Sequence, residues 1–401
     1  QDAKLASYNL PDVIIGGVTI KKSDLIRQKW LDNDFFGTTF STNYKTKKVD
    51  FIFGGALNRY VGSHYGKVIW ARFASSGEIN DKYYDNTAVK DDGNLFAKIN
   101  YQFTKKISIY GDLQYRKVIY NANSPETGVV NDVFRFVNPK IGLDVALNDK
   151  NNLYFSYAKA QREPNRNDYE SGNPKPEKLD DFELGWRFNS SKTQINFNGY
   201  LMKYTDQLVL TGAIDEVGSP LRENVGDSYR IGIEFDGTFK ASSKWYIKPN
   251  FTLSQNKNTN FVFQRDGVLQ NLGSTNIAFS PNFIAANQFI FVANKNLQIA
   301  LLSKYVGEQF MGNIDSKYSK LNAYFTNDIN VMYEIKPKSV FKAIVFSGIV
   351  TNLLDVKYES NGYFFTYDDD YSTPGTVTTI EGAGFYPQAG IHFLVGMNLK
   401  F

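Results

Sequence analysis

The last twelve residues of the chain, GIHFLVGMNLKF at positions 390–401, alternate between apolar and other side chains. Successive side chains of a β-strand point to opposite faces, so this period of two predicts a strand with one apolar face. That face would carry Ile391, Phe393, Val395, Met397, Leu399 and Phe401, and the opposite face Gly390, His392, Gly396, Asn398 and Lys400. The segment therefore predicts a long strand between an apolar environment and a polar one.

The same alternation recurs at residues 107–116, 141–145 and 229–240, whereas helical stripes are nearly absent. We find no run of about 18 apolar residues, the minimum for a membrane-spanning helix. The mean hydropathy of −0.37 is also too polar for a bundle of membrane helices. The sequence therefore predicts an all-β fold.

Connections between the predicted strands alternate between short and long. The short ones fall near residues 45–48, 104–106, 148–151, 189–192, 241–243, 294–296 and 336–339. The long ones fall at about 59–94, 121–131, 163–178, 209–226, 259–275, 309–319 and 354–387. Short periplasmic turns and long extracellular loops are typical of an antiparallel transmembrane β-barrel of the bacterial outer membrane.

A large soluble all-β protein, such as a propeller or a double sandwich, also has alternating strands and is the alternative fold. Two features favour the barrel. Many predicted strands reach about ten residues, whereas globular strands average about five or six. Aromatic residues also collect at strand ends, as the interface girdles of barrels do. They are Tyr44, Tyr101, Tyr115, Tyr120, Trp245 and Tyr246.

The strand count is about fifteen, an odd number that an antiparallel barrel cannot close. An open edge facing lipid would leave backbone groups without hydrogen bonds, at a cost of several kcal/mol each. We therefore expect this sequence to be the C-terminal portion of a longer, plugged barrel of about 22 strands. Residues 1–34 are predicted to be an extracellular loop entering the barrel, and residues 35–401 the barrel strands.

Composition argues against two classes of function. The sequence has no cysteine and two histidines, His64 and His392. Disulfides, iron–sulfur clusters and thiol catalysis are therefore excluded, and no nucleophile motif with a positioned base is recognisable. The 45 Lys and Arg against 41 Asp and Glu give a net charge of +4, which is too small and too evenly spread for a nucleic-acid surface. We predict neither an enzyme nor a nucleic-acid-binding protein.

Four blocks of sequence, in family order, resemble the barrel of TonB-dependent outer-membrane receptors. They are LYFSYAKAQREPNR at 153–166, PEKL at 176–179 with FELG at 182–185, NVGDSYRIGIE at 224–234, and NLLDVKY at 352–358 followed by Tyr386, Pro387 and the final strand. The matching structural positions are Pro164, Pro176, Glu177, Glu183, Gly185, Asn352, Leu353, Asp355, Tyr358 and Phe401. Residues 23–35 and 162–168 also resemble the variants found in receptors of Bacteroidota.

The resemblance implies a receptor in the outer membrane of a Gram-negative bacterium. Such receptors import a scarce ligand, such as a ferric siderophore, haem, cobalamin or another metal chelate, when TonB pulls on an N-terminal plug. It implies outer-membrane lipid and TonB as partners, a surface lipoprotein as a further one, and no resident cofactor. A passive porin and a scaffold subunit of an outer-membrane complex stay open as alternatives, because the alternation of strands fits them equally well.

Three arginines in the predicted extracellular loops are candidate ligand-binding residues: Arg162, Arg166 and Arg222. A guanidinium group can hold a carboxylate or an anionic chelate through two hydrogen bonds. The competing interpretation is that Arg162 and Arg166 brace their loop through local carboxylates such as Glu163 and Asp168.

Exposed aromatic residues in two long loops are the other candidates for ligand contact. They are Tyr83 and Tyr84 in the first loop, and Tyr363, Phe364, Phe365 and Tyr367 in the last. Asp368, Asp369 and Asp370 follow directly, and three carboxylates could hold a hard cation or form a solvated loop tip. The sequence does not decide whether these aspartates bind a metal ion. His64 and His392 could each supply only one ligand to a metal site.

Overall fold

The computed structural model describes residues 3–73, 80–124, 127–214, 220–337 and 340–401. The side chains of residues 171, 212–214, 220 and 221 are not described. Within the described residues, no helix has the length and apolar character needed to cross a membrane. The chain forms two compact units, one made of residues 1–45, 51–98 and 113–138, and the other of 46–50, 99–112 and 139–401.

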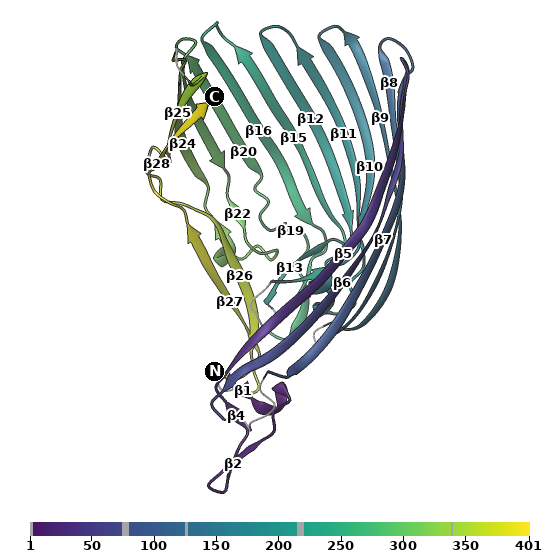
Figure 1. Ribbon diagram of the computed structural model, residues 1–401, viewed down its shortest axis with the longest axis vertical. Coiled ribbons are helices and arrows are strands. Elements are labelled where there is room, and N and C mark those ends of the chain that lie inside the picture. Colours follow the sequence, from purple (N-terminus) through teal and green to yellow (C-terminus); the bar gives the residue numbers. More distant parts are fainter. Residues whose placement is uncertain (1–2, 74–79, 125–126, 215–219, 338–339) are drawn as a thin grey trace. The chain divides into compact units, whose positions relative to one another are not determined.

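Nearly all regular structure belongs to one antiparallel sheet (Figure 1). Its strands, in chain order, are β5 (Leu25–Lys45), β6 (Val49–Ala71), β7 (Lys82–Gln102), β8 (Ile107–Ser124), β9 (Gly128–Asn148), β10 (Asn151–Arg162), β11 (Glu177–Asn189), β12 (Thr193–Thr205), β15 (Ser228–Lys240), β16 (Trp245–Asn258), β20 (Phe283–Val292), β21 (Leu297–Val306), β24 (Tyr324–Ile335), β25 (Ala343–Thr351) and β28 (His392–Lys400). The short β19 (Thr275–Asn276) pairs with β16 beside this path. The predicted all-β class and strand number are confirmed.

The sheet is open along its path in the described part of the chain. Neighbours follow chain order from β5 to β28, and these two strands stand at opposite ends of the path, each paired along one edge.

The predicted faces of the strands are present. In β15, Ile231 and Ile233 are 45% and 37% exposed, although they are large and apolar. An exposed face that carries such apolar side chains suits contact with lipid. In β28, Phe393 and Val395 have the same orientation and are 72% and 77% exposed. The interleaved positions, such as Glu234, carry the polar face.

The short turns fall where the sequence predicts them, at residues 46–48, 103–106, 149–150, 190–192, 241–244, 293–296 and 336–342. All seven lie in the second unit, at one end of the sheet (Figure 1). Residues 338 and 339 of the last predicted turn lie outside the described residues.

The long connections differ from the prediction. The loop expected at 59–94 is mostly strand, because β6 continues to Ala71 and β7 begins at Lys82. Residues 121–131 are also largely the ends of β8 and β9. Beyond Leu57 and Leu95 the outward face is interrupted by the charged pair Arg59 and Asp91. The sequence there resembles a loop, although backbone pairing persists. Residues 74–79, 125–126 and 215–219 of the predicted loops lie outside the described residues.

Four other connections contain hairpins of their own. They are β13 (Leu208–Ile214) with β14 (Pro220–Asn224), β17 (Val262–Arg265) with β18 (Val268–Asn271), β22 (Gln309–Phe310) with β23 (Lys320–Leu321), and β26 (Glu359–Asp369) with β27 (Thr378–Pro387). The 3-10 helix η2 (Arg166–Ser171) lies between β10 and β11, and η3 (Lys317–Ser319) lies between β22 and β23.

The start of the chain is more structured than a simple loop. It contains β1 (Ala3–Lys4), η1 (Leu5–Tyr8), β2 (Val13–Ile15), β3 (Val18–Ile20) and β4 (Lys22–Ser23). Leu5, Leu10 and Val68 form a small buried core there. Since β5 begins at Leu25, the expected boundary between residues 34 and 35 falls inside a strand.

Candidate ligand-binding site

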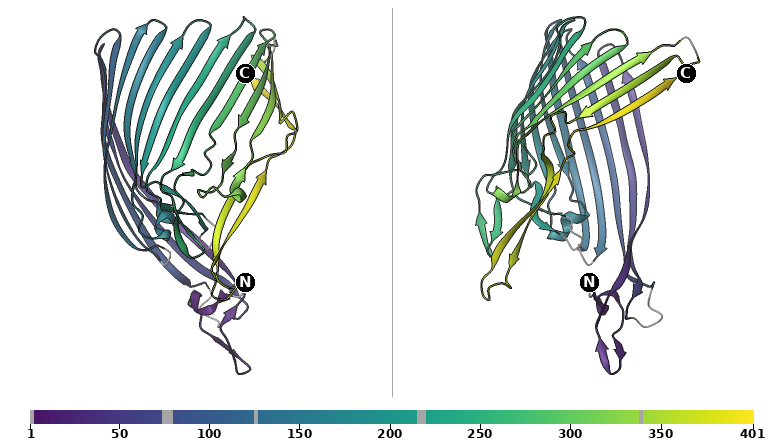
Figure 2. Two further views of the ribbon diagram at one scale, coloured as in Figure 1. Left: turned by 180° about the vertical axis from the view of Figure 1, so that it is seen from behind. Right: turned by 90° about the vertical axis from the view of Figure 1, so that its left-hand side faces the viewer.

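The long loops of the second unit share a hydrophobic core. Val209 from hairpin β13–β14, Phe261 and Phe263 at hairpin β17–β18, and Ile314 from the 309–319 connection are all buried together. Phe364 of β26 packs against the same cluster. These loops therefore form one assembly, which we call the loop core, at the end of the sheet opposite the short turns (Figure 2).

One ion pair and several hydrogen bonds join hairpin β17–β18 to hairpin β26–β27. Arg265 Nη2 lies 3.1 Å from Glu381 Oε1, and Ser316 also donates a hydrogen bond to Glu381. The backbone N–H of Asp266 donates to Thr379 Oγ1 at 2.7 Å, and Thr379 N–H donates to Asp266 Oδ1 at 2.7 Å. The hairpins thus have a fixed register with respect to each other.

Hairpin β26–β27 presents a ladder of aromatic rings. The ring centroids of Tyr363 and Phe365 are 6.3 Å apart at 18°, and those of Phe365 and Tyr367 are 6.3 Å apart at 13°. Gly382 and Gly384 lie opposite Phe365 and Tyr363, and a Cβ at either glycine would collide with the facing ring. Tyr363 and Tyr367 remain more than half exposed. The four aromatic residues predicted as one group therefore lie on two faces of the hairpin. Phe364 packs against the loop core, and Tyr363, Phe365 and Tyr367 lie on the opposite face.

Two of the three adjacent aspartates have partners within the protein. Asp368 accepts hydrogen bonds from Gln264 Nε2 at 3.1 Å and Thr379 Oγ1 at 2.8 Å. Asp369 Oδ1 accepts the N–H groups of Tyr371 and Ser372 at 3.0 and 3.1 Å. Within the described residues, no group of three or more His, Asp or Glu side chains is placed to hold a metal ion.

Arg162 and Arg166 contact local carboxylates. Arg162 Nε lies 3.0 Å from Glu177 Oε1, and the other oxygen of Glu177 accepts the N–H of Leu208 at 3.2 Å. Arg166 Nη1 lies 3.5 Å from Glu170. Both arginines therefore form ion pairs with carboxylates near their own loop.

Asp168 has a different role, as part of a capping box that opens η2. Asn165 N–H donates to Asp168 Oδ2 at 2.7 Å, and Asp168 N–H donates to Asn165 Oδ1 at 3.2 Å. Such reciprocal bonds satisfy backbone donors at the start of a helix. Asp168 is 2% exposed, and within the described residues its Oδ1 has no hydrogen-bond partner.

A polar cavity of about 420 Å³ lies between the η2 loop and hairpin β13–β14. Asp168, Lys175, Asp206, Arg222 and Glu223 bring charged groups to its walls. Lys175 Nζ lies 3.9 Å from Asp206 Oδ1. Among the described residues, no carboxylate forms an ion pair with Arg222. The cavity therefore presents the guanidinium group of Arg222 on its wall.

Asn224 holds the wall of this cavity in place. Its Nδ2 donates to the carbonyl oxygens of Lys175 at 3.0 Å and Asp206 at 2.6 Å, and its Oδ1 accepts the N–H of Lys175 at 2.7 Å. Of the cavity's charged residues, the sequence marked Arg222 as a ligand contact. It missed Lys175 and Asp206 because they lie in different loops, and only the fold brings them together.

Tyr83 and Tyr84 lie in the first unit, where their rings pack against each other. Their ring centroids are 5.0 Å apart at 75°, and Tyr83 also meets Tyr8 edge to face at 4.9 Å. Tyr83 packs against the core formed by Leu5, Leu10 and Val68.

The residues at the C-terminal block of the resemblance fix the junction between β25 and β28. Asn352 is 1% exposed, and its amide donates to Val356 O and Ala389 O at 2.9 and 3.2 Å. Asp355 Oδ1 accepts the N–H of Ile391 at 2.9 Å. Both have positive φ, 52° and 50°, in a region that Asn and Asp tolerate better than most residues. These side chains have structural contacts.

The other positions of the resemblance also have structural contacts. Pro164 is buried, and Ser156 Oγ donates to Glu183 at 3.3 Å. Leu353 N–H donates to Asn327 O at 2.7 Å, and the Tyr358 ring stacks on that of Tyr324 at 4.3 Å. Three positions remain. The Tyr154 ring lies over Gly185, and the Phe401 ring contacts that of Phe341. Pro176 is half-buried.

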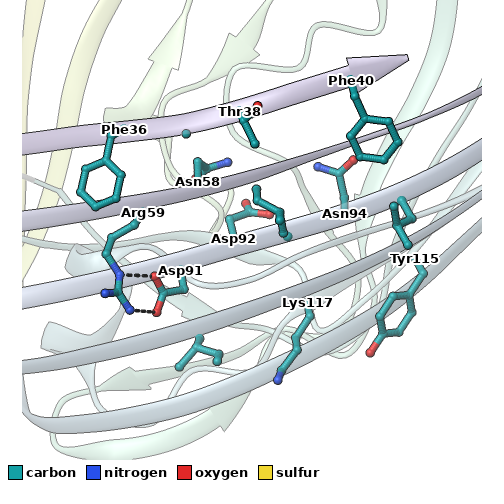
Figure 3. Close-up of a pocket in the computed structure, with 15 residues that line it drawn as sticks. Phe36, Thr38, Phe40, Asn58, Arg59, Asp91, Asp92, Asn94, Tyr115 and Lys117 are labelled. Atoms are coloured by element: carbon teal, nitrogen blue, oxygen red, sulfur yellow. Dashed lines mark hydrogen bonds and ion pairs between the residues drawn. The ribbon is translucent and has the colours of Figure 1, made fainter. Parts of the chain in front are cut away.

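A second cavity, of about 810 Å³, lies on the first unit (Figure 3). Phe36, Leu57 and Leu95 line its apolar part. Arg59 there makes two bonds to Asp91, at 2.6 and 2.8 Å (Figure 3). Because the guanidinium is already paired and the lining is that of the outward face, this cavity is a poor candidate for a soluble ligand.

Residues 5–353 match the family model described as TonB dependent receptor-like, beta-barrel. The chain belongs to this family. TonB-dependent receptors are transporters of the Gram-negative outer membrane and are not enzymes, so the predicted family and class are confirmed. A comparison with curated protein sequences gave no match.

Solved structures of TonB-dependent receptors have the same fold. The copper transporter OprC matches with a TM-score of 0.72 at 15% identity, over 94% of this chain and 57% of that one. The siderophore receptor PiuA from Acinetobacter baumannii matches with a TM-score of 0.65 at 14% identity, over 92% and 56%. The ferric citrate transporter FecA matches with 0.64 at 15%, over 94% and 56%. The chain thus spans about half the length of these receptors.

Proposed function

We propose that this chain is the barrel portion of an outer-membrane receptor of a Gram-negative bacterium that imports a metal chelate with energy supplied through TonB. The ligand class that we favour is a ferric siderophore or another metal chelate with carboxylate groups. Structures of similar fold are named as transporters of copper and ferric citrate. Haem and cobalamin belong to the same general class of scarce ligands, and the finer resemblance to receptors of Bacteroidota stays a prediction.

The observation that carries this proposal is the polar cavity of about 420 Å³ beside the loop core. Its volume is within the usual range for small-molecule sites, about 300–1,000 Å³. Arg222 supports binding of a carboxylate, because a guanidinium group matches two carboxylate oxygens.

Uptake of iron-55 citrate and of an iron-55 catecholate chelate by cells that express the full-length receptor tests the proposal. We expect saturable uptake that stops when an uncoupler removes the proton gradient. Arg222→Gln should raise the concentration for half-maximal uptake several-fold at equal surface expression. Arg187→Gln is the matched control, since Arg187 lies near the turn end, where Nη1 is 3.7 Å from Asp144.

Two other results would favour the alternatives. Uptake that rises linearly with concentration and ignores the uncoupler would favour a passive porin. Failure to take up either chelate, together with stable co-purification of a surface lipoprotein, would favour a scaffold subunit.

A further inference from the structure

The outward, lipid-suited face of the second unit changes from apolar to basic along one row of cross-strand partners. In register across β10, β11, β12, β15 and β16, the row consists of Lys159, Asp180, Lys203, Tyr229 and Lys257. The preceding outward row, nearer the turns, consists of Tyr157, Phe182, Leu201, Ile231 and Gln255. Lys178 lies one outward position beyond Asp180 on β11.

The height of this row matches the edge of the apolar band of a membrane barrel. Lys203 lies ten positions after Thr193, the first residue of β12. At about 3.3 Å per residue and a tilt of about 45°, ten residues rise about 23 Å. The apolar band of such barrels is about 25 Å tall. The lysines therefore lie where lipid head groups on the loop side begin.

The row has more positive charge than it can neutralise. Its single carboxylate, Asp180, accepts the Tyr157 hydroxyl at 2.7 Å and lies 3.9 Å from Lys159 Nζ. In the part of the chain that the structure describes, Lys178, Lys203 and Lys257 form no ion pair. Lys203 and Lys257 are separated by one strand, about 10 Å, which lets two ammonium groups approach one phosphorylated head group.

An apolar groove of about 900 Å³ lies on the same face below the lysines. Its outward lining includes Phe155, Phe182, Leu184, Gly199, Leu201 and Ile233. The groove has room at Gly199 because this residue has no side chain. A Cβ there would meet only the Leu184 carbonyl oxygen, at 3.8 Å. Gly199, Leu201 and Lys203 alternate along β12, so the groove leads up to the basic row.

From this arrangement we propose that the outward face of β10–β16 is a binding site for one phosphorylated, acylated lipid of the outer leaflet. An acyl chain lies in the Gly199 groove, and Lys178, Lys203 and Lys257 hold the phosphate. The charge complementarity of the lysines selects an anionic lipid. This inference rests on the membrane placement in the proposed function.

Native mass spectrometry of the full-length receptor in detergent tests the site, with bisphosphorylated lipid A and zwitterionic phosphatidylethanolamine as probes. We expect one lipid A molecule to be retained, and phosphatidylethanolamine to be lost. The triple variant Lys178→Gln, Lys203→Gln, Lys257→Gln should bind lipid A at least tenfold more weakly. The matched control changes three exposed turn-end lysines, with Lys192→Gln, Lys244→Gln and Lys295→Gln, and should bind as the parent does.

A second variant separates lipid from free phosphate. Gly199→Leu fills the groove where a Cβ has room, so the barrel should fold, and lipid A retention should fall. Inorganic phosphate should compete only weakly. Equal binding by the triple variant and its control, or equal retention of both lipids, would overturn the proposal. Chelate uptake by the same variants should be unchanged, so that a failure of uptake in the parent counts against the proposed function and leaves the lipid site standing.

Discussion

Arg265 Nη2 and Glu381 Oε1 lie 3.1 Å apart, although 116 positions separate the two residues in sequence. The contact fastens hairpin β17–β18 to hairpin β26–β27. The carboxylate is the more buried partner, with 13% of its side chain exposed against 35% for the arginine. The two hairpins are therefore held together by a partly buried ion pair as well as by the hydrophobic loop core.

Glu381→Gln should destabilise the loop assembly by about 1–2 kcal/mol, because Arg265 and Ser316 both lose a charged acceptor that is shielded from water. Arg265→Gln should cost a similar amount, about 1–2 kcal/mol, because it leaves the more buried Glu381 carboxylate without its countercharge. Hydrogen exchange of peptides from both hairpins measures the effect. Equal protection in Glu381→Gln and the parent would contradict the role of this pair. Lys336→Gln, at a turn-end pair with Glu334, is the control.

Gly382→Val should disrupt the aromatic ladder, since any Cβ at this position collides with the Phe365 ring. Overpacking of this kind costs about 1–3 kcal/mol. We expect weaker near-ultraviolet circular dichroism from the stacked rings and local loss of protection from exchange. Gly348→Val is the matched control because a Cβ at Gly348 meets no atom within 4 Å. The ladder would be unimportant for the hairpin if both variants behaved alike.

Ile233→Lys and Thr238→Lys place the same charge on opposite faces of β15. Ile233 is on the outward face, and Thr238 shares the inward face with Asp236. A lysine on the lipid face costs about 2–4 kcal/mol near the bilayer midplane, whereas one on the polar face is tolerated. Urea titrations of folding into phosphatidylcholine vesicles would measure the difference. The assignment of faces fails if the two substitutions destabilise the protein equally.

The tip of hairpin β26–β27 should loosen in acid. Hydrogen bonds from the Ser372 side chain and from the N–H groups of Tyr371 and Ser372 lower the pKa of Asp369. Because the folded pKa lies below the ordinary value of about 3.9, the stabilisation is complete above that value and is lost as pH falls through the folded pKa. Limited proteolysis by pepsin from pH 2 to 5 should show increasing cleavage at the tip toward low pH. In Asp369→Asn the uncharged amide cannot titrate, so the part of the pH profile that comes from this group should disappear.

The strands could be predicted from the sequence, whereas the structure of the long connections could not. Alternation such as that of Phe393, Val395 and Met397 predicts a strand with one apolar face, so the fold class and the number of strands followed from it. Turn positions followed from polar residues between such runs. The extensions of β6 and β7 were missed because the alternating hydrophobicity of these strands ends before their backbone pairing does.

The candidate site was only partly predictable for a related reason. Arg222 was identified because its residue type and loop suited anion binding. Lys175 and Asp206 gave no signal, since their proximity depends on the hydrogen bonds of Asn224. Phe364 was assigned to the same surface as its neighbours, although strand alternation separates it from Phe365 and directs it to the loop core.

The shared core of Val209, Phe261, Phe263 and Ile314 also bears on how such a receptor can change its ligand. A single one of these loops transplanted from a relative would lack the partners against which its apolar residues pack. Chimeras that exchange the 209–226, 259–275, 309–319 and 354–387 segments as one set should retain their shape, and those that exchange one segment should not. Evolution of specificity in this chain would then proceed by compensated changes in several loops together.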